Sequence, residues 1–293
     1  MQADHSAAER SLRHGYADVN GVRLHYVAQG HGPLILFLHG FPEFWYGWKE
    51  LLPEFAKDHY AVAMDMRGYN LSSVPANLDA YEIPTLVEDV RALSEKLAAD
   101  KFVLVGHDWG GVIAWYFAAA HPELLRNLVI INAPHPTVFA RELANNSLQR
   151  QASAYFNLFG SPEAETVLSQ NDFAFPQQVL FSGGWATESD RQMYLECWRR
   201  GLTGGLNYYR AANLKSILGG EAPDPRQFAL LTRSISVPTL VIWGEKDFAL
   251  LTGNLDGLDE HVENLKIHRL PTAGHFVVHE QPGEVIRAMR QFL

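Results

Sequence analysis

Cysteine is almost absent from this sequence: Cys197 is the single one among 293 residues. No disulfide bond can therefore form within the chain, as is usual for proteins of a reducing compartment, and we expect a cytoplasmic location. The first residues also lack the basic start and apolar stretch of a secretory signal. The longest apolar runs, such as residues 34–38, are far shorter than the ~20 residues that a membrane-spanning helix needs.

Basic residues are outnumbered: 24 lysines and arginines stand against 33 aspartates and glutamates, which gives a formal net charge of −9. This balance argues against nucleic acid or an anionic membrane as a partner. The sequence shows no cluster of cysteine and histidine at metal-ligand spacing and no glycine-rich phosphate loop, so we expect neither a metal nor an organic cofactor. The sequence leaves open whether the chain acts as a monomer or as a homodimer.

Short apolar segments alternate with helical patterns along much of the chain. A hairpin is predicted first, because residues 16–19 and 22–27 flank Asn20-Gly21, a pair that favours tight turns. Continuous apolar runs then predict strands buried on both faces of a mostly parallel sheet. These strands span residues 34–38, 60–64, 102–106, 128–131, 239–243 and 266–270. Helices are predicted at residues 48–55, 85–99, 109–120 and 284–292, the third of them apolar almost all round and therefore buried. This alternation indicates an α/β architecture.

The alternation stops between about residues 134 and 232. This stretch holds aromatic residues and helical pieces at residues 146–159, 162–169 and 190–201, but no clear buried strand. The simplest interpretation is a helical cap at residues 134–232, inserted between two parts of one core at residues 1–133 and 233–293. A cap of this kind would close a pocket and exclude water from it.

The most informative segment is Gly106-His107-Asp108-Trp109-Gly110-Gly111, which lies between a predicted strand and a predicted helix. Strand, sharp turn and helix with small flanking residues form a nucleophile elbow, in which Asp108 stands where a serine hydrolase has its serine. A serine that attacked a saturated carbon would leave an ether, which water hardly cleaves. A carboxylate leaves an ester, which water can cleave. Asp108 therefore indicates an alkyl electrophile, such as an epoxide or an alkyl halide.

Hydrolysis of such an ester needs a base, an acid that orients the base, and donors for the oxyanion. Asp247, with Glu245 as its rival, follows a predicted buried strand and is the candidate acid. His275 follows the next strand and Gly274, and it is the candidate base, with His279 as the nearest alternative. The order of nucleophile, acid and base along the chain is the order typical of this elbow.

Two backbone N–H groups are candidates for the oxyanion hole. Trp109 directly follows the nucleophile, and Phe41 lies in the loop His39-Gly40-Phe41-Pro42-Glu43 after the strand at residues 34–38. Gly40 permits a close approach of the backbone, and Pro42 stiffens the loop. We therefore predict that this loop lies beside the elbow.

These motifs resemble the aspartate-nucleophile branch of the α/β-hydrolase superfamily, and soluble epoxide hydrolases most of all. The matching pieces are the loop at residues 39–43 with Trp45 and Trp48, the segment 65–69, the elbow, Asp247 and His275. The resemblance covers nearly the whole chain from about residue 14. It implies an α/β-hydrolase fold, in which a mostly parallel eight-stranded sheet is flanked by helices and carries an inserted helical cap. Asn70 departs from the pattern, since glycine is commoner there, but asparagine tolerates the left-handed conformation that glycine would supply.

The same resemblance implies two cap tyrosines that hold and protonate the epoxide oxygen. Tyr155 occupies the first position and Tyr209 the second, with the adjacent Tyr208 as the alternative. A phenol in a dry pocket can supply the proton that an alkoxide leaving group needs. The further residues expected to line the pocket for a small apolar substrate are Phe156, Tyr208, Phe276 and His39.

Three functions fit the sequence, and the first is hydrolysis of epoxides to vicinal diols through a covalent aspartyl ester. The second is a haloalkane or haloacid dehalogenase that uses the same nucleophile on an alkyl halide. The Trp109 indole could bind a halide, but no second donor is evident, and Trp109 and Val112 stand where the similar fluoroacetate dehalogenases have arginines. The third is a non-catalytic ligand binder, which has no physical need for a nucleophile, a base, an acid and two tyrosines together.

Overall fold

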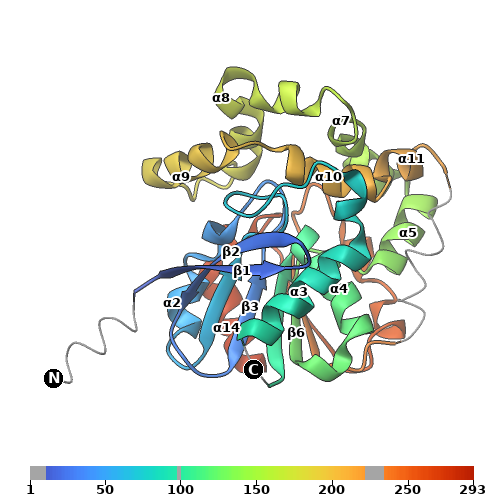
Figure 1. Cartoon of the computed structure of the whole chain (residues 1–293). Coiled ribbons are helices and arrows are strands. Elements are labelled where there is room, and N and C mark those ends of the chain that lie inside the picture. Colours follow the sequence, from blue (N-terminus) through green and yellow to red (C-terminus); the bar gives the residue numbers. More distant parts are fainter. Residues whose placement is uncertain (1–10, 98–99, 222–233) are drawn as a thin grey trace.

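The chain is described by a computed structural model over residues 11–97, 100–221 and 234–293. Its centre is an eight-stranded sheet in the order β1-β2-β4-β3-β5-β6-β7-β8. The strands are β1 (Arg13–Val19), β2 (Val22–Gln29), β3 (Leu34–Leu38), β4 (Tyr60–Met64), β5 (Phe102–His107), β6 (Leu125–Ile131), β7 (Thr239–Gly244) and β8 (Leu265–Leu270). Helices flank the sheet, and a further set of helices lies beyond one end of its strands (Figure 1).

The predicted hairpin is confirmed, because β1 and β2 pair antiparallel around Asn20-Gly21. Both turn residues have a positive φ, 46° at Asn20 and 75° at Gly21, which is the conformation that a tight two-residue hairpin turn requires. β2 also runs antiparallel to β4, whereas β4, β3, β5, β6, β7 and β8 are parallel to one another. The prediction of a mostly parallel eight-stranded sheet, which the family resemblance implied, is therefore confirmed.

The carboxyl ends of the parallel strands meet at one edge of the sheet. β3 and β5 are buried along their whole length, and the loops after β3, β5, β6, β7 and β8 leave the sheet at this edge. Functional sites of open α/β sheets collect at this edge. The topology alone therefore brings together the loop at residues 39–43, the elbow at Asp108, and the loops that hold Asp247 and His275.

The prediction of a strand buried on both faces is wrong for β8. It is the last strand of the sheet and pairs with β7 on one side only. Lys266, Ile267 and Arg269 are exposed, and Leu270 is the one buried residue of the strand. An edge strand with basic side chains is a common way to discourage pairing with another chain.

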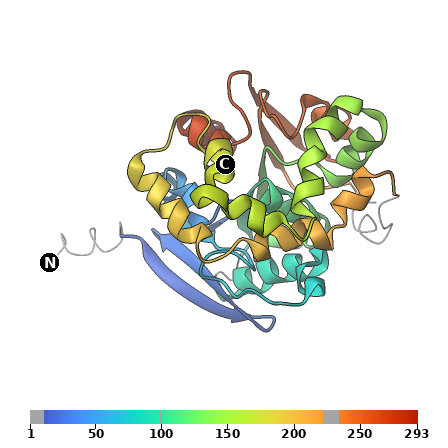
Figure 2. The same ribbon diagram turned by 90° about the horizontal axis from the view of Figure 1, so that it is seen from above.

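Two layers of helices cover the faces of the sheet. α3 (Ile83–Leu97) and α4 (Trp109–Ala120) pack together on one face, and α2 (Leu51–Phe55) and α14 (Pro282–Phe292) lie on the other (Figures 1 and 2). Most of α4 is buried, as its apolar sequence predicts. The helix predicted at residues 48–55 is shorter than expected, because the 3₁₀ helix η1 (Trp45–Trp48) precedes α2.

The described part of residues 134–221 is helical and contains no strand. It comprises α5 (Pro136–Asn145), α6 (Ser147–Ala152), the 3₁₀ helix η4 (Ser153–Tyr155), α7 (Phe156–Phe159), α8 (Ala164–Leu180), α9 (Glu188–Trp198), α10 (Thr203–Ala211) and α11 (Leu214–Leu218), which we call the helical layer. From α7 to α11 it lies above the carboxyl edge of the sheet (Figure 1). The expected boundary at residue 232 lies outside the described residues. None of the described helices is long and apolar enough to cross a membrane.

A close backbone contact sets the position of α10 on the core. A Cβ atom at Gly204 would come within 2.0 Å of the carbonyl oxygen of Gly68, so only glycine fits there. The next turn of α10 carries Tyr208, whose hydroxyl donates a 2.8 Å hydrogen bond to the carbonyl of Arg67. In the same loop Asn70 has a φ of 46°, the left-handed conformation that its departure from glycine predicts. This docking determines where Tyr209 lies.

Candidate active site

Asp108 occupies a strained turn between β5 and α4. Its φ of 50° and ψ of −121° are unusual for a residue other than glycine, as expected of a nucleophile elbow. The backbone N–H of Phe41 donates a 2.8 Å hydrogen bond to Oδ1 of Asp108. Gly40 permits this contact, because a Cβ atom at Gly40 would lie 2.2 Å from the same oxygen. Trp109 is the first residue of α4, where backbone N–H groups have no acceptor within the helix. Both predicted oxyanion donors therefore adjoin Asp108.

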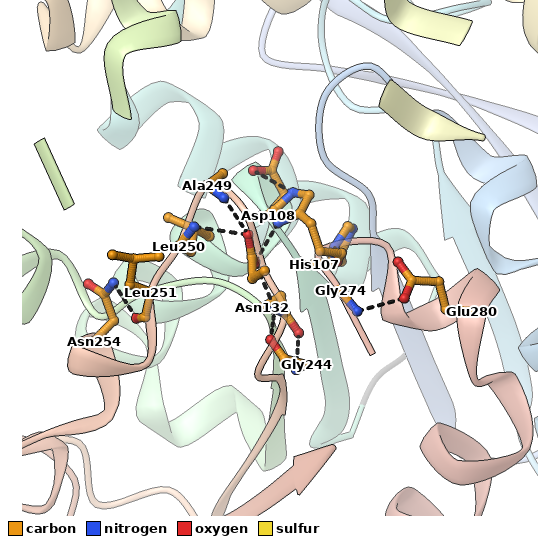
Figure 3. A network of polar contacts seen from close by, with 12 residues as sticks. His107, Asp108, Asn132, Gly244, Ala249, Leu250, Leu251, Asn254, Gly274 and Glu280 are labelled. Carbon is orange, nitrogen blue, oxygen red and sulfur yellow. Dashed lines mark hydrogen bonds and ion pairs between the residues drawn. The ribbon is translucent and has the colours of Figure 1, made fainter. Parts of the chain in front are cut away.

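His275 lies between two carboxylates. Its Nε2 is 3.6 Å from Oδ2 of Asp108, and its Nδ1 is 2.7 Å from Oδ2 of Asp247. Asp247 is itself fixed by the backbone N–H groups of Ala249 and Leu250, which donate to its Oδ1 over 2.8 and 2.9 Å. Figure 3 draws these two hydrogen bonds as dashed lines from Ala249 and Leu250. The three residues that the sequence predicts as nucleophile, base and acid are thus brought together, with His275 hydrogen-bonded to Asp247 and at ion-pair distance from Asp108.

The two carboxylates and the imidazole shift one another's protonation. Burial acts to raise the pKa of Asp108, but the hydrogen bond and charge of His275 outweigh it and hold this pKa below its ordinary value. Burial acts to lower the pKa of His275, but the charges of Asp247 and Asp108 and their hydrogen bonds raise it well above its ordinary value. Asp108 is therefore an ionised carboxylate, as the proposed chemistry requires, and its negative charge favours the protonated form of the neighbouring His275.

Tyr155 and Tyr209 face Asp108 from the helical layer. Tyr155 ends η4 and Tyr209 belongs to α10, and their rings are 6.1 Å apart. Tyr209 stands edge-on to Trp109, with ring centroids 5.2 Å apart. Burial and the charge of Asp108 raise the pKa of both tyrosines well above the ordinary value of 10. Both phenols therefore keep their protons in the neutral and mildly alkaline range.

Two cavities border Asp108. The larger cavity has a volume of about 330 Å³ and the smaller about 100 Å³. Asp108, Tyr155 and Tyr209 line both of them. Of the other residues expected at the pocket, Phe276 lines the larger cavity and Phe156 the smaller.

The structure does not bring every predicted residue to the site. His39 is buried, and its ring bonds to the carbonyl of Gly40 and to the backbone N–H of Met66, so it holds the loop instead of lining either cavity. Tyr208 likewise lines neither cavity, since its hydroxyl is directed at Arg67. The expectation that these two residues line the substrate pocket is wrong for both described cavities.

The rival residues take other partners. Glu245 forms an exposed ion pair with Arg269, at 3.0 Å. His279 is buried and bonds to Oε1 of Glu43 at 2.5 Å, away from Asp108. Of the two histidines, His275 therefore lies beside Asp108, and of the two acids Asp247 is the one that pairs with His275.

Asn132, which sequence reasoning missed, supports the acid. It directly follows β6 at the same sheet edge, and its side chain donates a 2.7 Å hydrogen bond to Oδ2 of Asp247. Its Oδ1 accepts from the backbone N–H of Gly244, so it also ties β6 to β7 (Figure 3). Its place directly after a predicted buried strand is the signal that could have identified it.

A second missed group is a buried cluster around Glu43. The carboxylate of Glu43 bonds to Nδ1 of His107 at 3.1 Å, to His279, and to the hydroxyl of Tyr194 on α9 at 2.9 Å. Burial acts to raise the pKa of Glu43, but His279 and His107 hold it well below its ordinary value. His107 also bonds to the backbone carbonyl of His275 at 2.9 Å. The cluster thus ties the loop after β3, the last residue of β5 and the segment after β8 to one another and to the helical layer.

Comparisons with known proteins agree with this geometry. The model of the alpha/beta hydrolase fold family matches residues 33–282. Among curated relatives, epoxide hydrolase 3 of Mus musculus is 36% identical over 285 residues, which cover 94% of this chain and 74% of that protein. Epoxide hydrolase 4 of Homo sapiens is 34% identical over 288 residues, which cover 94% of this chain and 76% of that protein.

Solved structures show the same similarity. The crystal structure of an epoxide hydrolase from Bacillus megaterium in complex with an inhibitor superposes with a TM-score of 0.89 at 39% identity, covering 95% of this chain and 99% of that chain. A mutant of an epoxide hydrolase from the same organism, complexed with a naphthyloxy-propanediol product, superposes with a TM-score of 0.89 at 38% identity, covering the same shares.

Proposed function

Because the chain belongs to the α/β-hydrolase fold family, we propose that it is an epoxide hydrolase, which converts apolar epoxides to vicinal diols through an ester on Asp108. The observation that carries this proposal is the meeting of Asp108, Tyr155 and Tyr209 at the walls of both cavities. A nucleophile and two protonated phenols that share one cavity wall suit an epoxide, whose ring oxygen needs a proton as its carbon is attacked. The relative with a bound propanediol product supports the same reaction.

The first step forms the ester. The epoxide oxygen accepts hydrogen bonds from Tyr155 and Tyr209, and Oδ2 of Asp108 attacks a ring carbon from the opposite side. The C–O bond of the ring breaks, and its oxygen takes a proton from a tyrosine. The hydrogen bond from Phe41 to Oδ1 of Asp108 orients the carboxylate for this attack.

The second step cleaves the ester. Alkylation removes the charge of Asp108, one of the two charges that raise the pKa of His275, so this pKa falls and His275 becomes a better base. His275, oriented by Asp247, takes a proton from water, which attacks the ester carbonyl. The N–H groups of Phe41 and Trp109 stabilise the oxyanion. Collapse of this intermediate breaks the ester C–O bond, and the departing oxygen takes the proton from His275 to complete the diol. The proton of the new carboxyl group on Asp108 returns to the tyrosinate, which restores both the carboxylate and the phenol.

The helical layer acts as a cap in this proposal, with the extent of 134–232 that the sequence predicts. It supplies Tyr155 and Tyr209 and much of the apolar wall around Asp108. Excluding water protects the first step and strengthens the hydrogen bonds inside the site. The proposed location is the cytoplasm, as expected from the single cysteine.

The dehalogenase alternative has less support. A departing halide needs N–H donors and no proton. Among the described residues that line the two cavities, only Trp109 and His275 have side-chain N–H groups, and Nδ1 of His275 is already paired with Asp247. The direct test is incubation with styrene oxide and, separately, with 1-chlorobutane. We expect phenylethanediol from the epoxide and no chloride above the enzyme-free control. Chloride release without diol formation would overturn the proposal.

The same assay tests the tyrosines when Tyr155→Phe and Tyr209→Phe are compared with the unaltered protein. Loss of an acid catalyst should slow ester formation by about 10²-fold in each variant. Tyr16→Phe is the control, since it removes the hydroxyl of an exposed tyrosine on β1 that lines neither cavity. Equal rates of ester formation in the two single variants, their double variant and the control would remove both tyrosines from the reaction.

The two steps should depend differently on pH. Asp108 has a pKa below its ordinary 3.8 and both tyrosines have a pKa above 10, so ester formation should stay constant between about pH 5 and pH 9. Ester hydrolysis needs neutral His275 and should slow as the pH falls through the pKa of His275 in the ester. Rapid quenching and intact-mass measurement should therefore find a larger fraction of ester at about pH 5 than at about pH 8. Parallel loss of both steps on acidification would contradict this assignment.

A further inference from the structure

The two cavities meet at the reacting groups and diverge from there. Asp108, Tyr155 and Tyr209 border both, whereas the remaining lining residues of the two cavities differ. The smaller cavity extends along α4, α5 and α11, past residues such as Val112, Ala140 and Leu214. The larger extends between the loops at Phe41 and Phe248 and the helices α6 and α8. An epoxide held at the reacting groups therefore has a separate space for a substituent on each ring carbon.

The two spaces differ in size. An apolar cavity of about 150 Å³ is known to hold benzene. The larger cavity, at about 330 Å³, exceeds this volume, and the smaller, at about 100 Å³, falls below it. The larger cavity can thus accept an aryl group, whereas the smaller accepts a short alkyl group. Phe41, Phe159 and Phe276 line the larger cavity and offer an aryl group aromatic edges and faces.

Both spaces are uncharged away from the reacting centre. Among the described residues that line them, Asp108 and His275 are the ionisable groups besides the tyrosines, and no lysine or arginine is present. A carboxylate or phosphate on either substituent would lose its hydration without gaining a counter-charge. The cavities therefore select neutral substituents.

The larger cavity is the one with exposed aromatic side chains in its wall. Phe175 on α8 is 45% exposed and Phe248 is 52% exposed, and both line this cavity, so part of its wall lies at the protein surface. A substrate that enters there must pass its leading substituent between Asp108 and the two tyrosines to reach the smaller cavity. The leading substituent must then be small, and the trailing one can be large.

We propose that the preferred substrates are neutral 1,2-disubstituted epoxides with one aryl and one short alkyl substituent, the aryl group occupying the larger cavity. This inference rests on the proposed function and specifies its substrate class. Neither the α/β fold nor the reacting residues require it, since both would serve a terminal or a symmetric epoxide equally well.

Four epoxides that share a phenyl group test the proposal on the unaltered protein. They are styrene oxide, trans-1-phenylpropylene oxide, trans-stilbene oxide and trans-3-phenylglycidate, whose second substituents are hydrogen, methyl, phenyl and carboxylate. We expect the highest kcat/KM for the methyl compound, and values at least about 10-fold lower for the stilbene oxide and the glycidate, the range that a misfit or an unpaired charge costs in such a pocket.

Two matched substitutions assign the substituents to the cavities. Ala140 lines the smaller cavity and Ala152 the larger, and both are partly exposed alanines on helices. Ala140→Phe should lower the ratio of kcat/KM for the methyl compound to that for styrene oxide by about 10-fold or more. Ala152→Phe should instead lower the ratio of either phenyl compound to trans-2,3-epoxybutane. Circular dichroism checks that each variant is folded, and Ala140→Met and Ala152→Met serve if the larger substitutions prevent folding.

The outcomes separate the two levels of the argument. Absence of diol from all of these epoxides would overturn the proposed function itself. Diol formation with similar kcat/KM for the methyl, phenyl and carboxylate compounds would leave the function intact and overturn the substrate class. If Ala140→Phe lowered the ratio of a phenyl compound to trans-2,3-epoxybutane, and Ala152→Phe lowered the ratio of the methyl compound to styrene oxide, the assignment of the aryl group to the larger cavity would be overturned.

Discussion

Replacing Asp108 by asparagine is expected to lower kcat for styrene oxide by at least about 10³-fold, because an amide oxygen is a far weaker nucleophile than a carboxylate. The variant should keep the fold. Asparagine tolerates the positive φ of 50° at this position, and its side-chain oxygen can still accept the hydrogen bond from the N–H of Phe41. The loss would therefore report on the chemistry of residue 108 and not on the stability of the elbow. Steady-state kinetics with circular dichroism as a check measure it.

Asp256→Asn is the matched control, since Asp256 lies exposed in a loop and lines neither cavity. A single turnover in ¹⁸O-water gives a second readout that does not depend on any variant. Water attacks the carbonyl carbon of the ester, so its oxygen should enter the carboxylate of Asp108, and the first diol released should carry none. Peptide mass spectrometry locates the label. First-turnover diol that contains ¹⁸O, with Asp108 unlabelled, would show that water attacks the epoxide directly.

Replacing His275 by glutamine should trap the enzyme as its ester. The first step needs Asp108 and the tyrosines, whereas the second needs a base 3.6 Å from Oδ2 of Asp108, which glutamine cannot be. We expect turnover to fall by about 10²- to 10⁴-fold, while ester formation persists. Intact-mass spectrometry should then show the protein heavier by the mass of one substrate molecule. Loss of the positive charge beside Asp108 also raises the pKa of that carboxylate, so the measurement belongs near neutral pH.

His121→Gln is a suitable control, because His121 follows the far end of α4 and pairs with Glu88 and Glu123 near the surface. It should form no lasting adduct. An adduct in neither variant, together with normal turnover by His275→Gln, would assign the base to another residue. Trapping that also occurs in the control would mean that the ester persists for a reason unrelated to His275.

Local sequence patterns were sufficient to predict where the central strands begin and end. Residues 34–38 and 60–64 form β3 and β4 with the predicted bounds, because short apolar runs between loops are stable only when both faces are covered. The elbow was predictable for a similar reason: glycines on both sides of Asp108 reflect a local backbone contact. At Gly106, for example, a Cβ atom would lie 2.4 Å from the carbonyl oxygen of Gly110. β8 was predicted less well, since a run of apolar and basic residues does not reveal that a strand lies at the edge of a sheet.

The sequence could not decide which of two neighbouring residues lines the site, and only the tertiary contacts answered this. Tyr208 and Tyr209 are adjacent on α10, so their side chains point about 100° apart, and the docking of Gly204 on Gly68 decides which of them faces Asp108. His39 and Glu43 lie in a loop that the sequence predicts beside the elbow, yet the His39 ring and the Glu43 carboxylate serve to hold neighbouring segments of the backbone in place. Such roles depend on partners far away in the sequence.

Short segments of the sequence were enough to predict a mostly parallel sheet and a carboxylate at residue 108 in a sharp strand-to-helix turn. They also showed an aspartate and a histidine after it, in the order that the proposed acid and base require. Each of these features depends on a short segment, in which a few neighbouring residues determine the backbone conformation. Only the tertiary structure decided the two unequal cavities and their uncharged walls, because the wall residues come from six or more separate helices and loops. Their meeting is a result of packing, and packing leaves no periodic pattern along a single segment.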